Sequence, residues 1–214
     1  MTTPTPAMPG NLFIVSAPSG GGKTSLTRAL VPRLAQRGHE AAISVSYTTR
    51  APRPGEQEGV HYHFVDEARF VAMVERGDFL EHAQVFGRRY GTGRDKTAEL
   101  LARGADVMLD IDWQGGQQVR RLMPEARSVF ILPPSADELE RRLRGRGQDD
   151  DATIARRMAE ARAEMSHWHE YDFLIVNRDF EQALDELTAL FLAPRLDRER
   201  QARRHAGLIR ALLE

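Results

Sequence analysis

One ten-residue stretch limits the folds open to this chain more than any other. The stretch "SAPSGGGKTS", Ser16 to Ser25, follows the apolar run Leu12–Val15 and precedes leucines at positions 26, 30 and 34. The apolar run predicts a buried strand, and the leucine spacing predicts a helix over Thr24–Gln36, although Pro32 weakens its second half. A strand, a glycine-rich turn and a helix in this order favour a loop that binds phosphate groups.

The stretch fits the pattern G-x-x-x-x-G-K-[ST] except at its first position, where Ala17 replaces glycine. In such a loop the backbone N–H groups converge on phosphate oxygens ahead of a helix N-terminus. Lys23 is expected to bridge the outer phosphates of a nucleoside triphosphate, and the Thr24 hydroxyl to ligate Mg²⁺. The alternative is a flexible turn with a solvated lysine. The residues expected around the triphosphate are Ala17, Pro18, Ser19, Gly20, Gly21, Gly22, Lys23, Thr24 and Ser25.

Two aspartates follow an apolar run in the middle of the chain. Asp110 closes "VML", and Asp112 comes two residues later on the same face of an extended backbone. Carboxylates at this end of a strand usually face the ligand crevice of an α/β fold. Asp110 is therefore expected to orient Mg²⁺ through a water molecule. For Asp112, capping of the next helix, "WQGGQQVRRLM", is an alternative.

Composition excludes several classes of protein. The 214 residues are 41% hydrophobic, enough for one buried α/β core, and their net charge of −1 gives no overall field for nucleic acid or a membrane surface. Cysteine is absent, which rules out disulfides and thiolate metal sites. The start "MTTPTPAMPG" lacks the regions of a secretory signal, and no apolar run approaches the ~18 residues of a membrane helix. We expect a cytoplasmic protein with a flexible N-terminus over residues 1–10.

Short apolar runs alternate with helical patterns along the chain, which predicts an α/β fold with a parallel sheet and helices on both faces. Two regions interrupt the alternation. Residues 47–104 are too long and too rich in Arg, Pro and Gly for a simple crossover, so we interpret them as an inserted subdomain. Residues 135–165 are charged and helical, broken at "RGRGQDDD" by glycines that permit a hinge. Further strands are expected at residues 41–46, 106–112, 128–132 and 172–176.

The inserted region carries a second candidate anion site. Pro52 and Pro54 keep the chain extended and display Arg50 and Arg53 at a fixed spacing. Two guanidinium groups suit a second phosphate, and the phenols of Tyr62 and Tyr90 are near in sequence. Taken alone, the two arginines are equally well explained as a solvated charge pair.

Taken together, these motifs resemble the guanylate kinase family from about Asn11 to the end of the chain. The resemblance rests on "SAPSGGGKTS", "SVSYTTRAPRPGEQEGVHY", "FLEHAQVFGRRYGT", "LDIDWQGGQQVR", "FILPPS", "RLRGRG" and "IVN". It implies an enzyme that transfers the γ-phosphoryl group of Mg-ATP to GMP. It also implies a three-layer fold like that of P-loop NTPases, with a parallel five-stranded core, a GMP-binding insertion and a helical lid.

The resemblance also implies a role for individual residues. Arg50, Arg53, Tyr62 and Tyr90 would hold the GMP phosphate. A carboxylate at Glu81 would accept the adjacent N1–H and N2–H₂ groups of guanine, which adenine lacks. Lys23 and the lid arginines Arg146 and Arg157 would stabilise the transferring group. The other residues implied are Ser46, Thr92 and Asp112 at GMP, and Arg142 and Asn177 at ATP.

The sequence pattern and the family resemblance together give the expected domain boundaries. The kinase-like domain is expected over residues 11–194, with a core of residues 11–46, 105–134 and 166–194, the insertion 47–104 and the lid 135–165. A C-terminal helix over 195–214 is expected to pack on the core. The alternative function is an inactive guanylate-kinase-like binding module, although such modules typically lose the lysine found here at position 23. GMP, dGMP and ATP are the expected partners, and the oligomeric state stays open.

Overall fold

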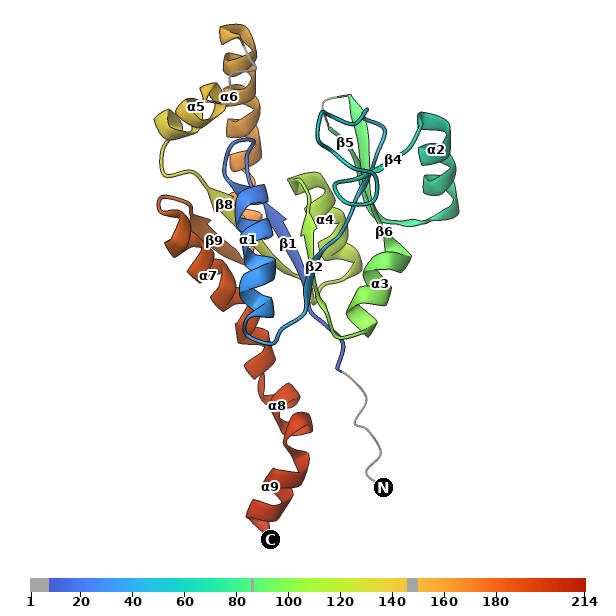
Figure 1. Cartoon of the computed structure of the whole chain (residues 1–214), viewed down its shortest axis with the longest axis vertical. Coiled ribbons are helices and arrows are strands. Elements are labelled where there is room, and N and C mark those ends of the chain that lie inside the picture. The colour runs from blue at the N-terminus through green and yellow to red at the C-terminus, as the bar shows by residue number, and fades with distance from the viewer. Residues whose placement is uncertain (1–7, 86, 146–149) are drawn as a thin grey trace.

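A five-stranded parallel sheet forms the centre of the computed structural model, which describes residues 8–85, 87–145 and 150–214 (Figure 1). The strand order is β2-β7-β1-β8-β9. The expected parallel core is therefore confirmed, with strand ends within a few residues of the predicted ones. The strands are β1 (Leu12–Ser16), β2 (Ala41–Ile43), β7 (Asp106–Asp110), β8 (Arg127–Leu132) and β9 (Phe173–Val176).

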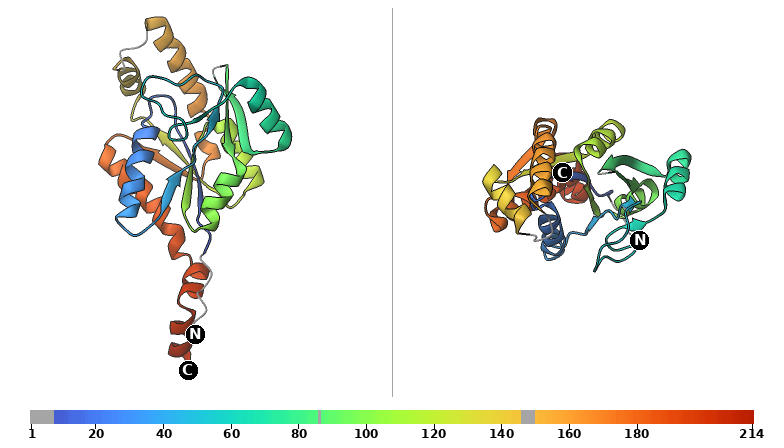
Figure 2. Two further views of the ribbon diagram at one scale, coloured as in Figure 1. Left: turned by 45° about the vertical axis from the view of Figure 1, so that its right-hand side comes forward. Right: turned by 90° about the horizontal axis from the view of Figure 1, so that it is seen from above.

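Alternate residues of the strands build the two sides of the core. In β1, Phe13 and Val15 pack with the leucines of α1 and with α7, whereas Leu12 and Ile14 pack toward α4 and α3. Both faces of the sheet are thus covered, which makes three layers (Figure 2). The helices are α1 (Lys23–Ala35), α3 (Arg94–Ala102), α4 (Trp113–Leu122) and α7 (Phe180–Leu192).

Helix α1 continues through Pro32, where the sequence predicted a weakened second half. Proline removes one backbone donor, which leaves a carbonyl of the preceding turn without its helical bond. Pro32 is exposed, so water can bond that carbonyl. The buried leucines at 26, 30 and 34 hold the helix on the sheet.

The predicted insertion forms a second, four-stranded sheet in the order β4-β3-β6-β5, flanked by helix α2. Its own small core consists of Phe70, Met73 and Phe79. The expected subdomain therefore folds around a core separate from that of the main sheet. Its elements are β3 (Tyr47–Thr48), β4 (His63–Phe64), α2 (Glu67–Arg76), β5 (Phe79–Val85) and β6 (Arg88–Gly93).

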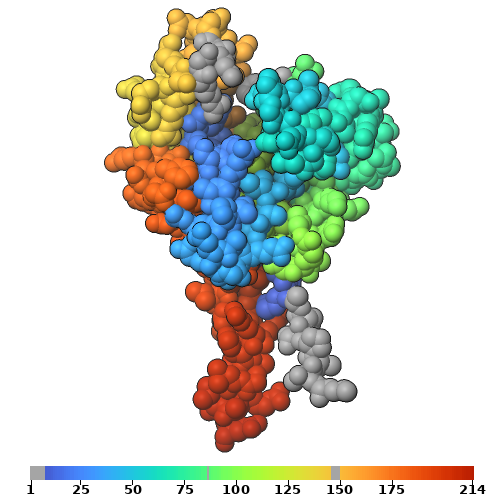
Figure 3. Space-filling model, in the orientation of Figure 1, coloured from blue at the N-terminus to red at the C-terminus, as the bar shows by residue number. Residues whose placement is uncertain are grey.

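The predicted lid consists of two helices, α5 (Ala136–Arg144) and α6 (Asp151–Met165). They pack on each other through Leu139 and Leu143 of α5 and Ile154, Met158 and Ala161 of α6. Ser135 and Asp150 cap their N-termini by accepting backbone N–H bonds. The lid and the insertion rise on opposite sides above the central sheet (Figure 1), and a notch separates them at the top of the space-filling view (Figure 3).

The C-terminal segment differs from the prediction of one helix packed on the core. A short 3₁₀ helix, η1 (Trp168–Glu170), precedes β9, and a second, η2 (Ala193–Leu196), follows α7. After η2 the chain forms two α-helices, α8 (Arg198–Arg204) and α9 (Ala206–Leu213). They project away from the sheet, and neither has a buried residue (Figures 1 and 2). Two ion pairs join the segment before them to the core: the Arg195 guanidinium pairs with the fully buried Asp106 at 2.7 Å, and Asp197 pairs with Arg127 of β8 at 3.2 Å.

The lengths and apolar character of the helices bear on membrane insertion. In the part of the chain that the structure describes, no helix has the length and the apolar surface needed to cross a bilayer.

Candidate active site

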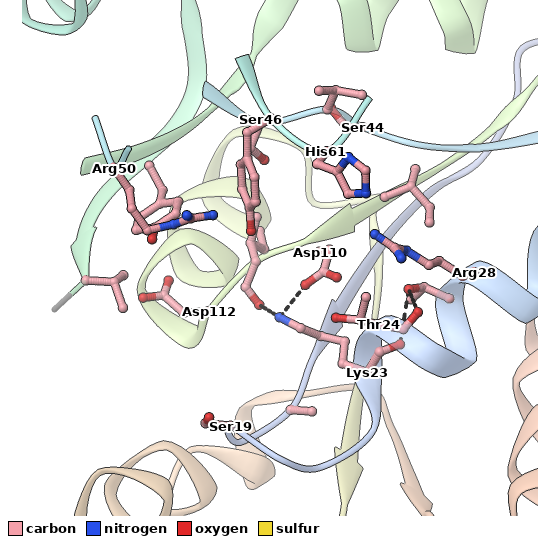
Figure 4. A pocket seen from close by; sticks show the side chains of 18 of the residues that line it. Ser19, Lys23, Thr24, Arg28, Ser44, Ser46, Arg50, His61, Asp110 and Asp112 are labelled. Carbon is pink, nitrogen blue, oxygen red and sulfur yellow. Dashed lines mark hydrogen bonds and ion pairs between the residues drawn. The ribbon is translucent and has the colours of Figure 1, made fainter. Parts of the chain in front are cut away.

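A cleft of about 550 Å³ opens at the carboxyl ends of the core strands, between the loop after β1 and the inserted sheet. Lys23 and Thr24 approach it from the loop side, and Ser46 and Arg50 from the opposite wall (Figure 4). Two sequence-distant groups of predicted residues therefore face one space. This is the edge at which α/β proteins bind their ligands.

The loop after β1 has the backbone that its glycines make possible. Gly20 and Gly22 have φ angles of 88° and 98°, a conformation that other residues rarely adopt. Helix α1 begins immediately afterwards at Lys23, so its N-terminal N–H groups and positive dipole end face the cleft. The backbone of the loop and the start of α1 thus have the arrangement of a phosphate-binding loop, and anion binding there stays a prediction.

Lys23 lies at the floor of the cleft with Asp110 as its partner. Its ammonium is 2.5 Å from Oδ1 of Asp110 and donates to the carbonyl of Ile111 at 3.2 Å. Burial lowers the pKa of Lys23, but the Asp110 carboxylate outweighs burial and leaves the pKa raised. Lys23 is therefore a charged group held in place before any phosphate arrives.

Asn177 and Arg142 lie behind the loop rather than in the cleft. The Asn177 amide donates to the carbonyl of Gly21 at 2.9 Å, and Arg142 donates to the carbonyl of Asn177 at 3.1 Å. Asn177 is buried, and it lies so close to Gly22 that a Cβ there would be 2.2 Å from its nitrogen. In this structure both residues support the loop, and their predicted contacts with ATP stay predictions.

The far wall brings together the predicted phosphate-binding group of the insertion. The Arg50 guanidinium lies 5.3 Å from the centre of the Tyr62 ring, and the Tyr62 and Tyr90 rings are 5.9 Å apart. Arg50 also donates to Oε1 of Glu56 at 2.8 Å, and the backbone of Arg53 donates to the same carboxylate. Glu56, whose pKa Arg50 lowers, thus holds the guanidinium of Arg50 and the backbone at Arg53.

Glu81 is a buried carboxyl on the cleft wall, and among the described residues no basic side chain pairs with it. It is 4% exposed and accepts a hydrogen bond from the Thr92 hydroxyl at 2.6 Å. Burial raises the pKa of Glu81 to about 7, and the Thr92 hydrogen bond only partly opposes this effect. Thr92 itself is fully buried, so it lies behind Glu81 and orients it.

Asp112 both caps α4 and lines the cleft, the two positions that the sequence left open. Its carboxylate accepts the Gly115 N–H at 2.9 Å and caps α4, and it also lines the cleft. Gly115 has no room for a side chain because a Cβ there would be 2.6 Å from Oε2 of Glu81. The cap therefore brings the start of α4 directly against the buried carboxyl.

The structure gathers most of the predicted site residues in the cleft, but not all. Gly21, Thr92, Arg142, Asn177 and Arg157 do not line it, and Arg146 lies outside the described residues. The predicted residues that line the cleft are Ala17, Pro18, Ser19, Gly20, Gly22, Lys23, Thr24, Ser25, Ser46, Arg50, Arg53, Tyr62, Glu81, Tyr90, Asp110 and Asp112.

Among the described residues, the cleft wall has four titratable side chains that are absent from the prediction: Arg28, Glu56, His61 and Glu164. The spacing of Arg28, one helical turn after Thr24, places it on the same face of α1 and was a usable signal. Glu56 and Glu164 carried no comparable signal, because charged side chains in loops and charged helices are usually solvated.

Comparisons with known proteins agree on one family. A sequence model of the Guanylate kinase family matches residues 9–193. A guanylate kinase of Salmonella choleraesuis is 59% identical over 204 residues, which cover 95% of this chain and 98% of that protein. One of Escherichia coli K12 is 58% identical over the same coverage. The crystal structure of guanylate kinase from Anaplasma phagocytophilum superposes with a TM-score of 0.73 at 34% identity, covering 90% of this chain and 89% of that one.

Proposed function

This chain belongs to the guanylate kinase family, and we propose how its cleft carries out the reaction of that family, the transfer of the γ-phosphoryl group of ATP to GMP. The products are ADP and GDP. The inactive binding module considered from the sequence has no observation in its favour, since Lys23 is present and faces the cleft.

The observation that carries the choice of GMP is the buried carboxyl of Glu81. Guanine presents N1–H and N2–H₂ side by side, and one carboxylate accepts both. Adenine places an acceptor at the same edge, which would leave a buried charge facing a lone pair. A site that leaves such a group unpaired rejects the wrong substrate strongly. Asp112 and Ser46 also line the cleft and are proposed as further contacts with the base.

The GMP phosphate is proposed to bind the group formed by Arg50, Arg53, Tyr62 and Tyr90. Arg50 now bonds to Glu56 and stacks near Tyr62, so its guanidinium is already oriented. A phosphate dianion brings more charge than one carboxylate and accepts bidentate bonds from arginine. Recognition through the base and the phosphate leaves the 2′-hydroxyl free, so we propose dGMP as a further substrate.

The triphosphate of ATP is proposed to lie on the loop after β1. The loop N–H groups and Lys23 hold its outer phosphates, and the lid arginines Arg146 and Arg157 complete the charge neutralisation. The Thr24 hydroxyl and the Asp110 carboxylate border the cleft floor and are oxygen ligands of the kind that Mg²⁺ prefers. Bound with ATP, Mg²⁺ would supply further neutralisation of the phosphate charge.

The reaction needs no general base in the protein. The second pKa of a phosphate monoester is near 6, so the attacking phosphate of GMP is mostly dianionic at pH 7. The protein therefore only has to align two anionic groups, neutralise them and exclude water. This requirement fits a cleft that holds basic side chains on both walls, Lys23 on one and Arg50 on the other.

Exclusion of water is proposed to come from closure of the lid and the insertion over both substrates. Each has a separate core, so each can move as a unit relative to the sheet. Solution scattering tests this step: the radius of gyration should fall when a non-hydrolysable ATP analogue and GMP are both bound. An unchanged radius would rule closure out. We also propose that the enzyme acts in the cytoplasm, where ATP and GMP are available together.

The experiment that tests the function measures ADP formation from ATP with GMP, AMP, CMP or UMP, each with and without Mg²⁺. We expect turnover with GMP and Mg²⁺ and very little with the other three. Lys23→Met should abolish it. Nucleotide binding without turnover would instead favour the binding module, and turnover with another monophosphate would mean that Glu81 does not choose the base.

A further inference from the structure

The lid touches the phosphate-binding loop at two consecutive residues. The N–H of Ser19 donates to Oε2 of Glu164, in the last turn of α6, at 3.1 Å. The next residue, Gly20, lies against α5, since a Cβ there would be 3.0 Å from Leu139 and 3.1 Å from Leu143. Both lid helices therefore rest on the loop that receives the triphosphate.

Glu164 is an unusual side chain to find at this place. It borders the cleft near Lys23, and burial raises its pKa, opposed by the Ser19 N–H and the charge of Lys23. A carboxylate beside a site for phosphates repels the ligand that the site is built to hold. Its presence there calls for a function that outweighs this repulsion.

The position of Glu164 along α6 indicates what that function is. Arg157 precedes it by seven residues, which is two helical turns, so both lie on the same face of α6 about 10 Å apart along the axis. Because α6 is one continuous helix, fixing its position at Glu164 also fixes the position of Arg157. The distance between Arg157 and the phosphates then depends on the contact between Glu164 and Ser19.

We propose that Glu164 is a positioning residue, which ties the end of α6 to Ser19 and so holds Arg157 in register with the phosphates on the loop. The proposal rests on the function given above, in which Arg157 stabilises the transferring group. The atom of Glu164 that holds the helix in place is the carboxylate oxygen that accepts the Ser19 N–H. The contribution appears in the chemical step and not in GMP binding, because the GMP-binding wall belongs to the insertion.

The test compares kcat and the KM for GMP in Glu164→Ala, Glu164→Gln and the control Glu160→Ala. Glu160 lies one turn earlier on α6, and its carboxylate is 3.9 Å from the exposed Arg156. A small misplacement of a catalytic group is costly, so Glu164→Ala should lower kcat about thirtyfold with an unchanged KM for GMP. Glu164→Gln keeps an oxygen that accepts the Ser19 N–H and should stay within about threefold of the parent, as should the control.

A double mutant separates positioning from a general loss of structure. If Glu164 acts through Arg157, adding Glu164→Ala to Arg157→Ala should lower kcat by less than about threefold further. Multiplicative losses would overturn the proposal, as would a glutamine variant that is as impaired as the alanine variant. A parent enzyme that fails to phosphorylate GMP would refute the proposed function itself, whereas an active parent with an unaffected Glu164→Ala refutes only this inference.

Discussion

Replacing Glu81 with glutamine should make the protein more stable while it removes the use of GMP. The carboxyl is 4% exposed and has no basic partner in the part of the chain that the structure describes, and burial raises its pKa from 4.5 to about 7. At ~1.36 kcal/mol per pH unit, the ionised form of Glu81 therefore costs folding about 3 kcal/mol. Glutamine has no charge to bury, and its amide oxygen can still accept the Thr92 hydroxyl.

The raised pKa of Glu81 determines how the stability difference between the parent and Glu81→Gln changes with pH. Below pH 4.5 Glu81 is neutral in both the folded and the unfolded chain, so the two proteins should have similar free energies of unfolding. As pH rises from 4.5 to about 7, the unfolded chain releases the proton more readily, and the parent loses stability relative to Glu81→Gln. Above about pH 7 the difference should be constant, at about 3 kcal/mol in favour of the variant.

Urea unfolding at pH 4.5, 6, 7 and 8 measures this difference directly. The control is Glu75→Gln, which makes the same exchange of side chain at an exposed position of α2. At pH 8 the kcat/KM of Glu81→Gln for GMP should fall at least about a hundredfold, while its affinity for ATP stays unchanged. A stability difference that does not vary with pH, or equal losses for GMP and ATP, would refute the role of Glu81.

Three further predictions follow from close contacts and exposed surface. Gly115→Ala places a Cβ 2.6 Å from Oε2 of Glu81, so the dissociation constant for GMP should rise about tenfold and that for ATP should not change, as measured by calorimetry. Asp106→Asn leaves Arg195 without its buried partner and should lower the free energy of unfolding by roughly 3 kcal/mol in urea. Deletion of residues 198–214 removes no buried residue and should shift the melting temperature by less than about 2 °C; a larger loss would show that α8 and α9 dock on a surface.

The sequence predicted the core well because local patterns decide it. Alternating apolar residues in β1 and the leucine spacing of α1 each fix one buried face, and the glycines at 20 and 22 fix the loop between them. The motifs of the family then located the cleft. The helix predicted over Thr24–Gln36 forms even though it contains Pro32, since packing of the leucines outweighs one missing hydrogen bond.

The remaining features depend on contacts between distant parts of the chain. Glu164 lies 145 residues from Ser19, and nothing in the helix that carries it distinguishes it from its charged neighbours. The family resemblance implied that Thr92 lies at GMP. In the structure Thr92 is fully buried and donates to Glu81, and its contact with GMP stays a prediction. Leu208 and Leu212 form an apolar stripe on α9, yet both are exposed, so this stripe does not pack on the core as the C-terminal helix was expected to. A stripe indicates a buried face only where a complementary surface lies within reach.

The most direct test of guanine recognition by Glu81 compares GMP with IMP and AMP as phosphoryl acceptors at saturating Mg-ATP. IMP keeps the N1–H of guanine and lacks its 2-amino group, so it should lose one hydrogen bond to a charged acceptor. Such a bond is worth about 1.5–3 kcal/mol, which predicts a kcat/KM for IMP about ten- to a hundredfold below that for GMP. AMP should show very little turnover. Equal use of GMP and IMP, or comparable use of AMP, would contradict the account.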